Sequence, residues 1–250
     1  MAKRQFSAVV LDLFDTLVKW EPTRLPLLNW RGKSTHSTMP WVLPVLEERL
    51  GQAFNEERFM EVYSSVIDEI TAERERDGIE ITCHERFRRA MDRYLPGCEN
   101  AAFAEELTRV HMAGVRAVTS APRERSEAVR RIAREYRLGL LSNFDDAQCG
   151  REVLFDTGVA DLFEAVIISA EVGLRKPNIE IYRRMLELLR VPADEVLFVG
   201  DAPREDIFGP QQVGMHTAWI SNGMERPPQG IPSPEFIIRD LAKLPRLLEI

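Results

Sequence analysis

Apolar residues at the start of the chain form one short run that ends in a carboxylate. The residues of Ala8–Leu11 are all apolar, and Asp12 follows them directly. A run of this length predicts a strand that is buried on both faces. A buried strand has no structural need for a charge at its carboxyl end, where α/β folds place their ligand sites. Asp12 is therefore the first candidate for a chemical role, as a nucleophile.

The apolar positions change to helical spacing in the next hundred residues. Residues 17–40 are rich in turn-forming residues and predict an irregular segment. Thr82 with Glu85 three residues later is a capping box, which marks the start of a helix. From residue 42 onward apolar residues recur every three or four positions, which predicts an all-helical block over residues 20–118.

Beyond Pro122 short apolar runs alternate with helical segments. The runs cover residues 138–141, 165–168, 196–199, 217–220 and 236–238. This alternation predicts a parallel sheet with right-handed crossovers. Because the first strand precedes the helical block, the block is an insertion. We predict an α/β core domain, residues 1–19 and 119–250, interrupted by a helical domain, residues 20–118.

Composition narrows the classes of function. The 250 residues carry 33 Lys and Arg against 40 Asp and Glu, a net charge of −7. This balance argues against nucleic-acid binding but allows an anionic substrate, since a pocket can be locally positive. No signal peptide precedes the first strand and no apolar run could span a bilayer. We expect a cytoplasmic protein without membrane or nucleic-acid partners. Its oligomeric state, monomer or homodimer, stays open.

The three cysteines do not suggest a disulfide or metal site. Cys83, Cys98 and Cys149 are odd in number and lack the paired spacing of zinc ligands. We expect free, reduced thiols, as is usual inside cells.

Polar side chains follow three of the predicted strands. Asp12 follows the first strand, and Ser142 and Asn143 follow the run at 138–141. Asp201 comes after the run at 196–199, and Asp206 lies five residues further. The carboxyl ends of parallel strands meet at one edge of a sheet, so these groups can converge on one crevice.

The residue types fit nucleophilic catalysis by a carboxylate. The hydroxyl of Ser142 and the amide of Asn143 can hold transferring oxygens. Asp201, with Asp206 as ligand or support, can join Asp12 around a hard cation such as Mg²⁺. Carboxylates this close repel one another, so a cation or a lysine must offset their charge.

Lys176 is the candidate for that lysine. The pair Lys176-Pro177 predicts a helix that begins with Pro177 at its first position, a geometry that aims the lysine at the sheet edge.

Four motifs in this order resemble those of the haloacid dehalogenase (HAD) superfamily of hydrolases. They are Asp12-Leu13-Phe14-Asp15-Thr16-Leu17, Leu141-Ser142-Asn143, Arg175-Lys176-Pro177, and Val199-Gly200-Asp201 with Asp206. The resemblance covers residues 1–19 and 119–250, and the helical block lies where members with a cap after the first motif carry it. It implies a Rossmann-like core, an aspartyl-enzyme intermediate, usually Mg²⁺, and a cap that selects the substrate.

The resemblance also implies a role for individual residues. Thr16 and Ser142 would orient a phosphoryl group, and Lys176 would balance charge. Phe14 would contribute to the metal site through its backbone carbonyl, and we also expect it to contact substrate. Arg24 follows the catalytic strand where a cap hinge meets the pocket, which makes it a candidate substrate contact. The expected metal site comprises Asp12, Phe14, Asp201 and Asp206.

The chain departs from the phosphatase pattern at Phe14. Phosphatase members usually carry a second Asp there, which protonates the leaving group and then activates water. Asp15 is one residue further, and such a shift turns a side chain to the other face of an extended strand. Whether Asp15 replaces the acid stays open. Loss of a general acid costs roughly 10²–10⁴-fold in rate.

Dehalogenating members offer an alternative, because they carry an aromatic residue at this position and halide leaves without a proton. Tyr182 also suits their pattern. However, they carry Ser and Asn where this chain has Asp201 and Asp206, and they need no metal. The sequence favours a Mg²⁺-dependent, phosphatase-type hydrolase that acts on a small phosphorylated molecule. The alternatives are a metal-independent 2-haloacid dehalogenase and a catalytically weak binding protein of this fold.

Overall fold

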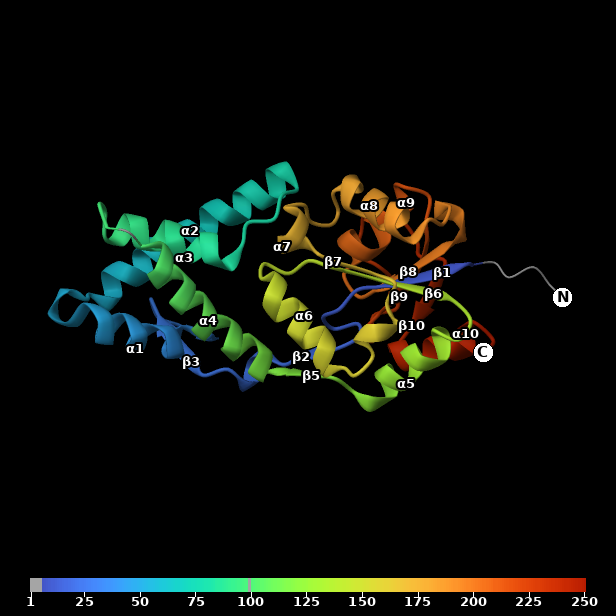
Figure 1. Ribbon diagram of the computed structural model, residues 1–250, viewed down its shortest axis with the longest axis horizontal. Coiled ribbons are helices and arrows are strands. Elements are labelled where there is room, and N and C mark those ends of the chain that lie inside the picture. The colour runs from blue at the N-terminus through green and yellow to red at the C-terminus, as the bar shows by residue number, and fades with distance from the viewer. Residues whose placement is uncertain (1–5, 99) are drawn as a thin grey trace. The chain divides into compact units, whose positions relative to one another are not determined.

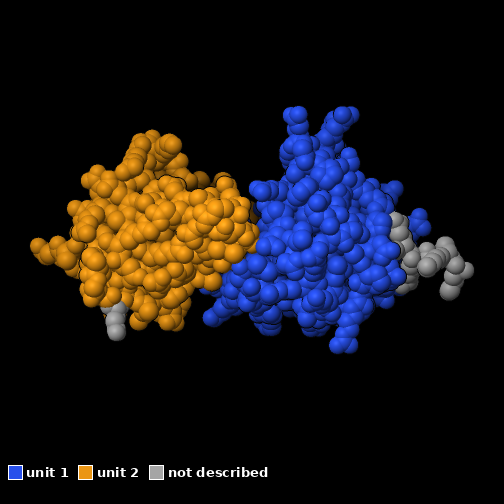
Figure 2. All heavy atoms as spheres, turned by 90° about the horizontal axis from the view of Figure 1, so that it is seen from above, with its two compact units in different colours: residues 1–19, 120–250 blue, residues 20–119 orange. Residues whose placement is uncertain are grey.

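The structure, a computed structural model, describes residues 6–98 and 100–250 (Figure 1). The chain divides into two compact units. Unit 1 comprises residues 1–19 and 120–250, and unit 2 comprises residues 20–119 (Figure 2). No helix in the described part of the chain has the length and apolar character needed to cross a bilayer.

Unit 1 is built on a six-stranded sheet in which every pair of neighbours is parallel. In the order β10-β9-β8-β1-β6-β7, the strands are Phe236–Ile238, His216–Ile220, Val196–Gly200, Ala8–Leu11, Arg137–Ser142 and Ala165–Ile168. The predicted parallel sheet is confirmed. The first strand of the chain lies between β8 and β6, so chain segments on either side of the insertion meet in the centre of this sheet.

Helices cover both faces of this sheet. Figure 1 shows α8 and α9 on one side and α5, α6 and α10 on the other. The α-helices are α5 (Arg123–Ile132), α6 (Ala147–Asp156), α7 (Ser169–Val172), α8 (Ile179–Leu189), α9 (Gly209–Gln211) and α10 (Leu244–Leu247). The short turns are η3 (Ala160–Leu162), η4 (Ala193–Glu195), the π-helix η5 (Pro203–Phe208) and η6 (Leu241–Lys243). The three layers form a Rossmann-like α/β fold.

Helix α8 packs closely on the sheet because β6 carries a glycine there. Its apolar face, with Ile181, Met185 and Leu189, is buried. A Cβ atom on Gly139 of β6 would lie 2.8 Å from the Met185 Sδ and 3.1 Å from the Leu189 Cδ1. The missing side chain therefore lets the helix approach the strand.

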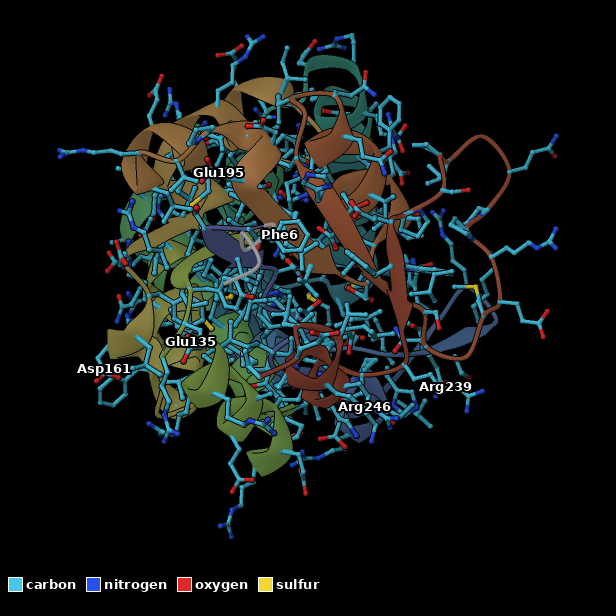
Figure 3. All side chains as sticks on the ribbon, turned by 90° about the vertical axis from the view of Figure 1, so that its right-hand side faces the viewer. Phe6, Glu135, Asp161, Glu195, Arg239 and Arg246 are labelled. Atoms are coloured by element: carbon cyan, nitrogen blue, oxygen red, sulfur yellow. The ribbon has the colours of Figure 1, made fainter. Side chains whose placement is uncertain are left out.

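The end of the sheet where β1 begins is closed by an aromatic cluster. The Phe6 ring makes edge contacts with His216, at 5.1 Å between ring centroids, and with Phe236, at 6.3 Å. Figure 3 faces this end and shows Phe6 and Glu195 there, and the Glu195 carboxylate accepts a hydrogen bond from Ser7. The carboxyl ends of the strands, where the candidate site lies, are at the other end.

Unit 2 is mainly helical. Its helices are η1 (Pro22–Arg24), α1 (Met39–Leu50), η2 (Gly51–Ala53), α2 (Glu56–Asp77), α3 (Cys83–Tyr94) and α4 (Ala101–Ala117). The Asn55 Oδ1 accepts a hydrogen bond from the Arg58 N at 2.8 Å, and the Thr82 Oγ1 accepts one from the Glu85 N at 3.1 Å. The first cap begins α2, and the second confirms the predicted start of α3.

The segment predicted to be irregular contains a hairpin instead. Strands β3 (Leu27–Trp30) and β4 (Lys33–His36) pair antiparallel, and β2 (Lys19–Trp20) pairs with β5 (Thr119–Ser120). The hairpin turn consists of Arg31 and Gly32, with φ angles of 49° and 73°. Turns of this kind are usually marked by Asn-Gly or Asp-Gly. The expectation of irregular structure was wrong because Arg31 hides the turn and the wholly exposed β4 has no alternating pattern.

Candidate active site

The site forms where β1 ends between its two neighbours. Leu11 is in register with Leu140 of β6 and with Val199 of β8, and the Asp12 N donates to the Val199 O at 3.0 Å. Asp12 therefore has the end of β6, Ser142, on one side and the end of β8, Gly200, on the other. This is the convergence that the strand order of a parallel sheet predicts.

Lys176 joins two of the carboxylates. Its side chain is only 2% exposed, and its Nζ donates to the Asp12 Oδ1 at 2.8 Å and to the Asp206 Oδ1 at 2.6 Å. Burial alone acts to lower the pKa of this ammonium group, but the charges of Asp12 and Asp206 outweigh burial and raise the pKa above its usual value. Lys176 is therefore a fixed positive charge rather than a proton donor.

The backbone of Lys176 is held by a side chain from β6's carboxyl end. The Asn143 Oδ1 accepts from the Lys176 N at 2.7 Å, and the Asn143 Nδ2 donates to the Lys176 O at 2.9 Å. The predicted helix start at Pro177 is wrong, because α8 begins at Ile179 with Asn178 as its N-cap. The backbone position of Lys176 is therefore fixed by the side chain of Asn143 and not by a helix start at Pro177.

Three carboxylates form an acidic cluster. One oxygen each from Asp12, Asp201 and Asp206 lies within 4.8 Å of the others. The Asp206 Oδ2 accepts from the Ala202 N at 2.9 Å, so both oxygens of Asp206 have donors within the protein. A Cβ atom on Gly200 would lie 2.2 Å from the Asp206 Oδ2, so this position needs a glycine.

The cluster carries more negative charge than Lys176 offsets. Burial raises the pKa of Asp12 to about 6, with Lys176 opposing the shift and Asp206 adding to it. Burial, together with the charges of Asp12, Asp206 and Asp15, raises the pKa of Asp201 to about 8. Repulsion of this kind is relieved by protons or by a bound cation. Hard carboxylate oxygens at this spacing fit Mg²⁺.

Two buried hydroxyl groups come from the segments that flank the nucleophile, the turn after β1 and the end of β6. The Thr16 Oγ1 and the Ser142 Oγ have no hydrogen-bond partner among the described residues, although both side chains are buried. Thr16 lies in the turn that follows Asp12, and Ser142 is the last residue of β6, the strand that pairs with β1. An unsatisfied buried hydroxyl costs about 1–3 kcal/mol, so such groups call for an explanation, and a bound oxyanion supplies one.

Phe14 packs on a residue that the sequence did not single out. The Phe14 and Phe144 ring centroids lie 4.7 Å apart, with 36° between the ring planes. Phe144 directly follows Asn143, so its position after the second motif was the only sequence signal. Asp15 has a φ angle of 55°, and its charge acts on Asp201.

Two further predicted residues have local structural partners. The Tyr182 hydroxyl donates to the Glu205 O at 2.5 Å and so ties α8 to η5. Arg24 lies in unit 2, where its guanidinium group donates to the Glu21 Oε2 at 3.0 Å and to the Ala117 O at 3.2 Å. Its role as a substrate contact stays a prediction.

A parallel α/β sheet with a nucleophile candidate, a buried lysine and an acidic cluster at its carboxyl edge defines a class of hydrolases. The model of the haloacid dehalogenase-like hydrolase family matches residues 6–214. The chain belongs to this family.

Curated relatives match over part of their length. A phosphoserine phosphatase of Thermus thermophilus is 36% identical over 108 residues, which are 43% of this chain and 42% of the relative. A glyceraldehyde 3-phosphate phosphatase of Pyrococcus abyssi is 38% identical over 88 residues, which are 35% of this chain and 37% of the relative. The chain thus spans about two fifths of the length of these relatives.

Solved structures match over the whole chain. A 2-haloacid dehalogenase from Pseudomonas syringae pv. Tomato DC3000 superimposes with a TM-score of 0.70 over 98% of each chain, at 22% identity. Likeness at this identity shows the fold alone, and the choice between phosphate and halide chemistry depends on the site.

Proposed function

We propose that this protein is a Mg²⁺-dependent, phosphatase-type hydrolase that acts on a small phosphorylated molecule. The observation that carries the proposal is the cluster of Asp12, Asp201 and Asp206, whose oxygens lie within 4.8 Å of one another. A 2-haloacid dehalogenase needs no cation and has no use for this excess of carboxylates. The two phosphatase relatives support the same choice.

The metal would be held mainly by Asp12 and Asp201, with the Phe14 backbone carbonyl as a further oxygen ligand. Asp206 supports the site, because Lys176 and the Ala202 N already occupy its two oxygens. Mg²⁺ bound there would neutralise the charge that develops on the transferring phosphoryl group.

The residues of the chain divide the remaining work. Asp12 attacks phosphorus, and the charge of Lys176 favours the ionised form that a nucleophile requires. The hydroxyls of Thr16 and Ser142 donate to phosphoryl oxygens and so become satisfied. Asn143 positions the backbone of Lys176, and its contact with the transferring oxygens stays a prediction.

The test is phosphate release from a panel of small phosphate esters and acyl phosphates in the presence of Mg²⁺. Wild-type protein should turn over at least one of them, and Asp12→Asn should abolish turnover. Asp161→Asn, a change at an exposed site in η3, is the matched control and should keep full activity (Figure 3). Activity that survives EDTA would exclude the metal mechanism.

A second candidate function is dehalogenation, which the pairing of Phe14 with Phe144 favours. An aromatic wall beside the nucleophile suits a leaving group that needs no proton. Chloride release from 2-chloropropionate in EDTA, lost in Asp12→Asn, would establish it. No chloride release together with Mg²⁺-dependent phosphate release would leave the first proposal standing.

A further inference from the structure

An aromatic residue, Phe14, stands at the chain position where phosphatase members of the family carry a proton donor. Phe14 is two residues after Asp12, and its ring packs on Phe144 at 4.7 Å between centroids. We call these two rings the aromatic pair. They come from the carboxyl ends of β1 and β6, the same two strand ends that supply Asp12 and Ser142.

The aromatic pair is held rigidly. The Phe144 N donates to the Ser169 Oγ at 2.8 Å, and the Ser169 hydroxyl donates back to the Phe144 O at 3.1 Å. A Cβ atom on Gly150 of α6 would lie 3.2 Å from the Phe144 Cδ1, so α6 packs closely against this ring. The Phe14 backbone forms a bridge with Val18. Such packing makes a fixed apolar wall.

The titratable groups of the acidic cluster and Lys176 interact with one another. Lys176 holds Asp12 and Asp206, and loss of its proton would leave two buried carboxylates unpaired. Asp206 has donors on both oxygens, and Asp201 belongs to the acidic cluster. The charge of Asp15 acts on Asp201, at the end of β8, whereas the Phe14 ring lies with the end of β6.

From this arrangement we infer that the natural substrate is an activated phosphoryl compound, whose leaving group departs as a stable anion without receiving a proton. Acyl phosphates, enol or aryl phosphates and phosphoanhydrides have this property, whereas alkyl phosphates do not. The inference rests on the proposed function and narrows its substrate class. The apolar part of such a leaving group would pack against the aromatic pair.

The reaction balances without a general acid. An Asp12 oxygen forms a bond to phosphorus while the bond to the leaving oxygen breaks, and that oxygen departs with the electron pair. Water then forms a bond to phosphorus and the bond to Asp12 breaks, which restores the carboxylate. One proton of the water stays on the phosphate and the other goes to solvent. A loose transition state needs little prior deprotonation of this water.

The consequence is a strong dependence of rate on the leaving group. A general acid is worth about 10²–10⁴-fold, and its absence penalises strongly basic leaving groups by that amount. Weakly basic leaving groups escape the penalty because they need no proton in the transition state.

The experiment compares kcat/KM for phenyl, 4-nitrophenyl and 2,4-dinitrophenyl phosphate, acetyl phosphate and glycerol phosphate, all with Mg²⁺. Wild-type protein should favour the least basic leaving groups by about 10²-fold or more. Phe14→Asp should raise kcat/KM for phenyl phosphate and flatten the series. Phe14→Leu, which removes the ring but supplies no acid, should keep the steep dependence.

Each other outcome is decisive. Equal kcat/KM for alkyl and activated phosphates in the wild type overturns the inference but keeps the proposed function. A flat wild-type series that becomes steep in Asp15→Asn overturns it by assigning the proton to Asp15. No turnover of any compound, the acyl phosphate included, overturns the proposed function as well. The wild-type series needs no variant, so a misfolded Phe14→Asp does not weaken the test.

Discussion

Lys176 is the residue that holds the candidate site together. Its ammonium group bridges Asp12 and Asp206 in a buried position, and removal of one partner from such a group leaves an uncompensated charge. From sequence we predicted that Asn143 would hold transferring oxygens, but its amide binds the backbone of Lys176. Sequence motifs identify the residue types, but they do not show which of two plausible partners a side chain contacts.

We predict that Asn143→Ala lowers kcat/KM by about 10–100-fold, because small displacements of catalytic groups have effects of this size. The variant loses both hydrogen bonds to Lys176 while every charge of the site remains. The measurement is kcat/KM on the best substrate of the phosphate panel.

Asn29→Ala is the matched control, since Asn29 accepts a single bond, from the exposed Ser34 of the hairpin. It should keep wild-type kcat/KM. Wild-type activity in Asn143→Ala would show that Lys176 needs no positioning by this amide.

At the scale of elements, the sequence predicted the strands better than the segments that shape the site. Strands β7 and β10 have the bounds that their apolar runs indicated. For β7 the reason is burial, since a buried strand must be apolar throughout. The π-helix η5 has no such signal, yet it carries Asp206 into the site. Single π-turns frequently occur at functional sites.

Contacts between distant elements also escaped prediction. Phe14 and Phe144 belong to motifs far apart in the chain, and they pair only because β1 and β6 are neighbours. The fold class could be predicted because it follows from local patterns. The pairing of individual side chains could not, because it depends on strand order and on helix approach.

Substitution of two glycines should affect different properties of the protein, activity for Gly200 and folding stability for Gly139. Gly200→Ala should abolish activity, because its Cβ would lie 2.2 Å from the Asp206 Oδ2 and would displace the carboxylate that Lys176 binds. Gly139→Ala should instead destabilise the fold by about 1–3 kcal/mol, a typical cost of overpacking against a core helix. Thermal unfolding and kcat/KM at 25 °C measure the two effects.

The comparison fails if the two variants behave alike. Gly139→Ala should keep its activity below its unfolding temperature. The residues that its Cβ would contact, Met185 and Leu189, belong to the buried face of α8 and not to the acidic cluster. An active Gly200→Ala would mean that the position of Asp206 does not matter for turnover.

At the scale of the molecule, an acidic chain gathers three carboxylates where an anionic substrate is expected to react. The net charge is −7, and the acidic cluster sets three carboxylates against one lysine. A phosphoryl group would be repelled from such a cluster unless a cation joined it. Cation binding should therefore be linked to folding stability.

This linkage predicts a pH-dependent stabilisation by Mg²⁺. The folded-state pKa values of Asp12, about 6, and Asp201, about 8, lie above the usual range of the unfolded chain. In metal-free protein, the stability that these two groups contribute is present at low pH and is lost as pH rises through about 6 and about 8. Mg²⁺ must displace protons at low pH but binds ionised carboxylates at high pH.

The increase in Tm on addition of Mg²⁺ should therefore be larger at pH 9 than at pH 6. Asp201→Asn should lose most of this increase, because it removes a ligand, and its metal-free Tm should fall less than the wild-type value between pH 6 and pH 9. Asp161→Asn should follow the wild type at both pH values. An equal Mg²⁺ effect in wild type and Asp201→Asn would place the cation away from the acidic cluster. Since Tm is measured without substrate, the result is independent of which phosphoryl compound the protein hydrolyses.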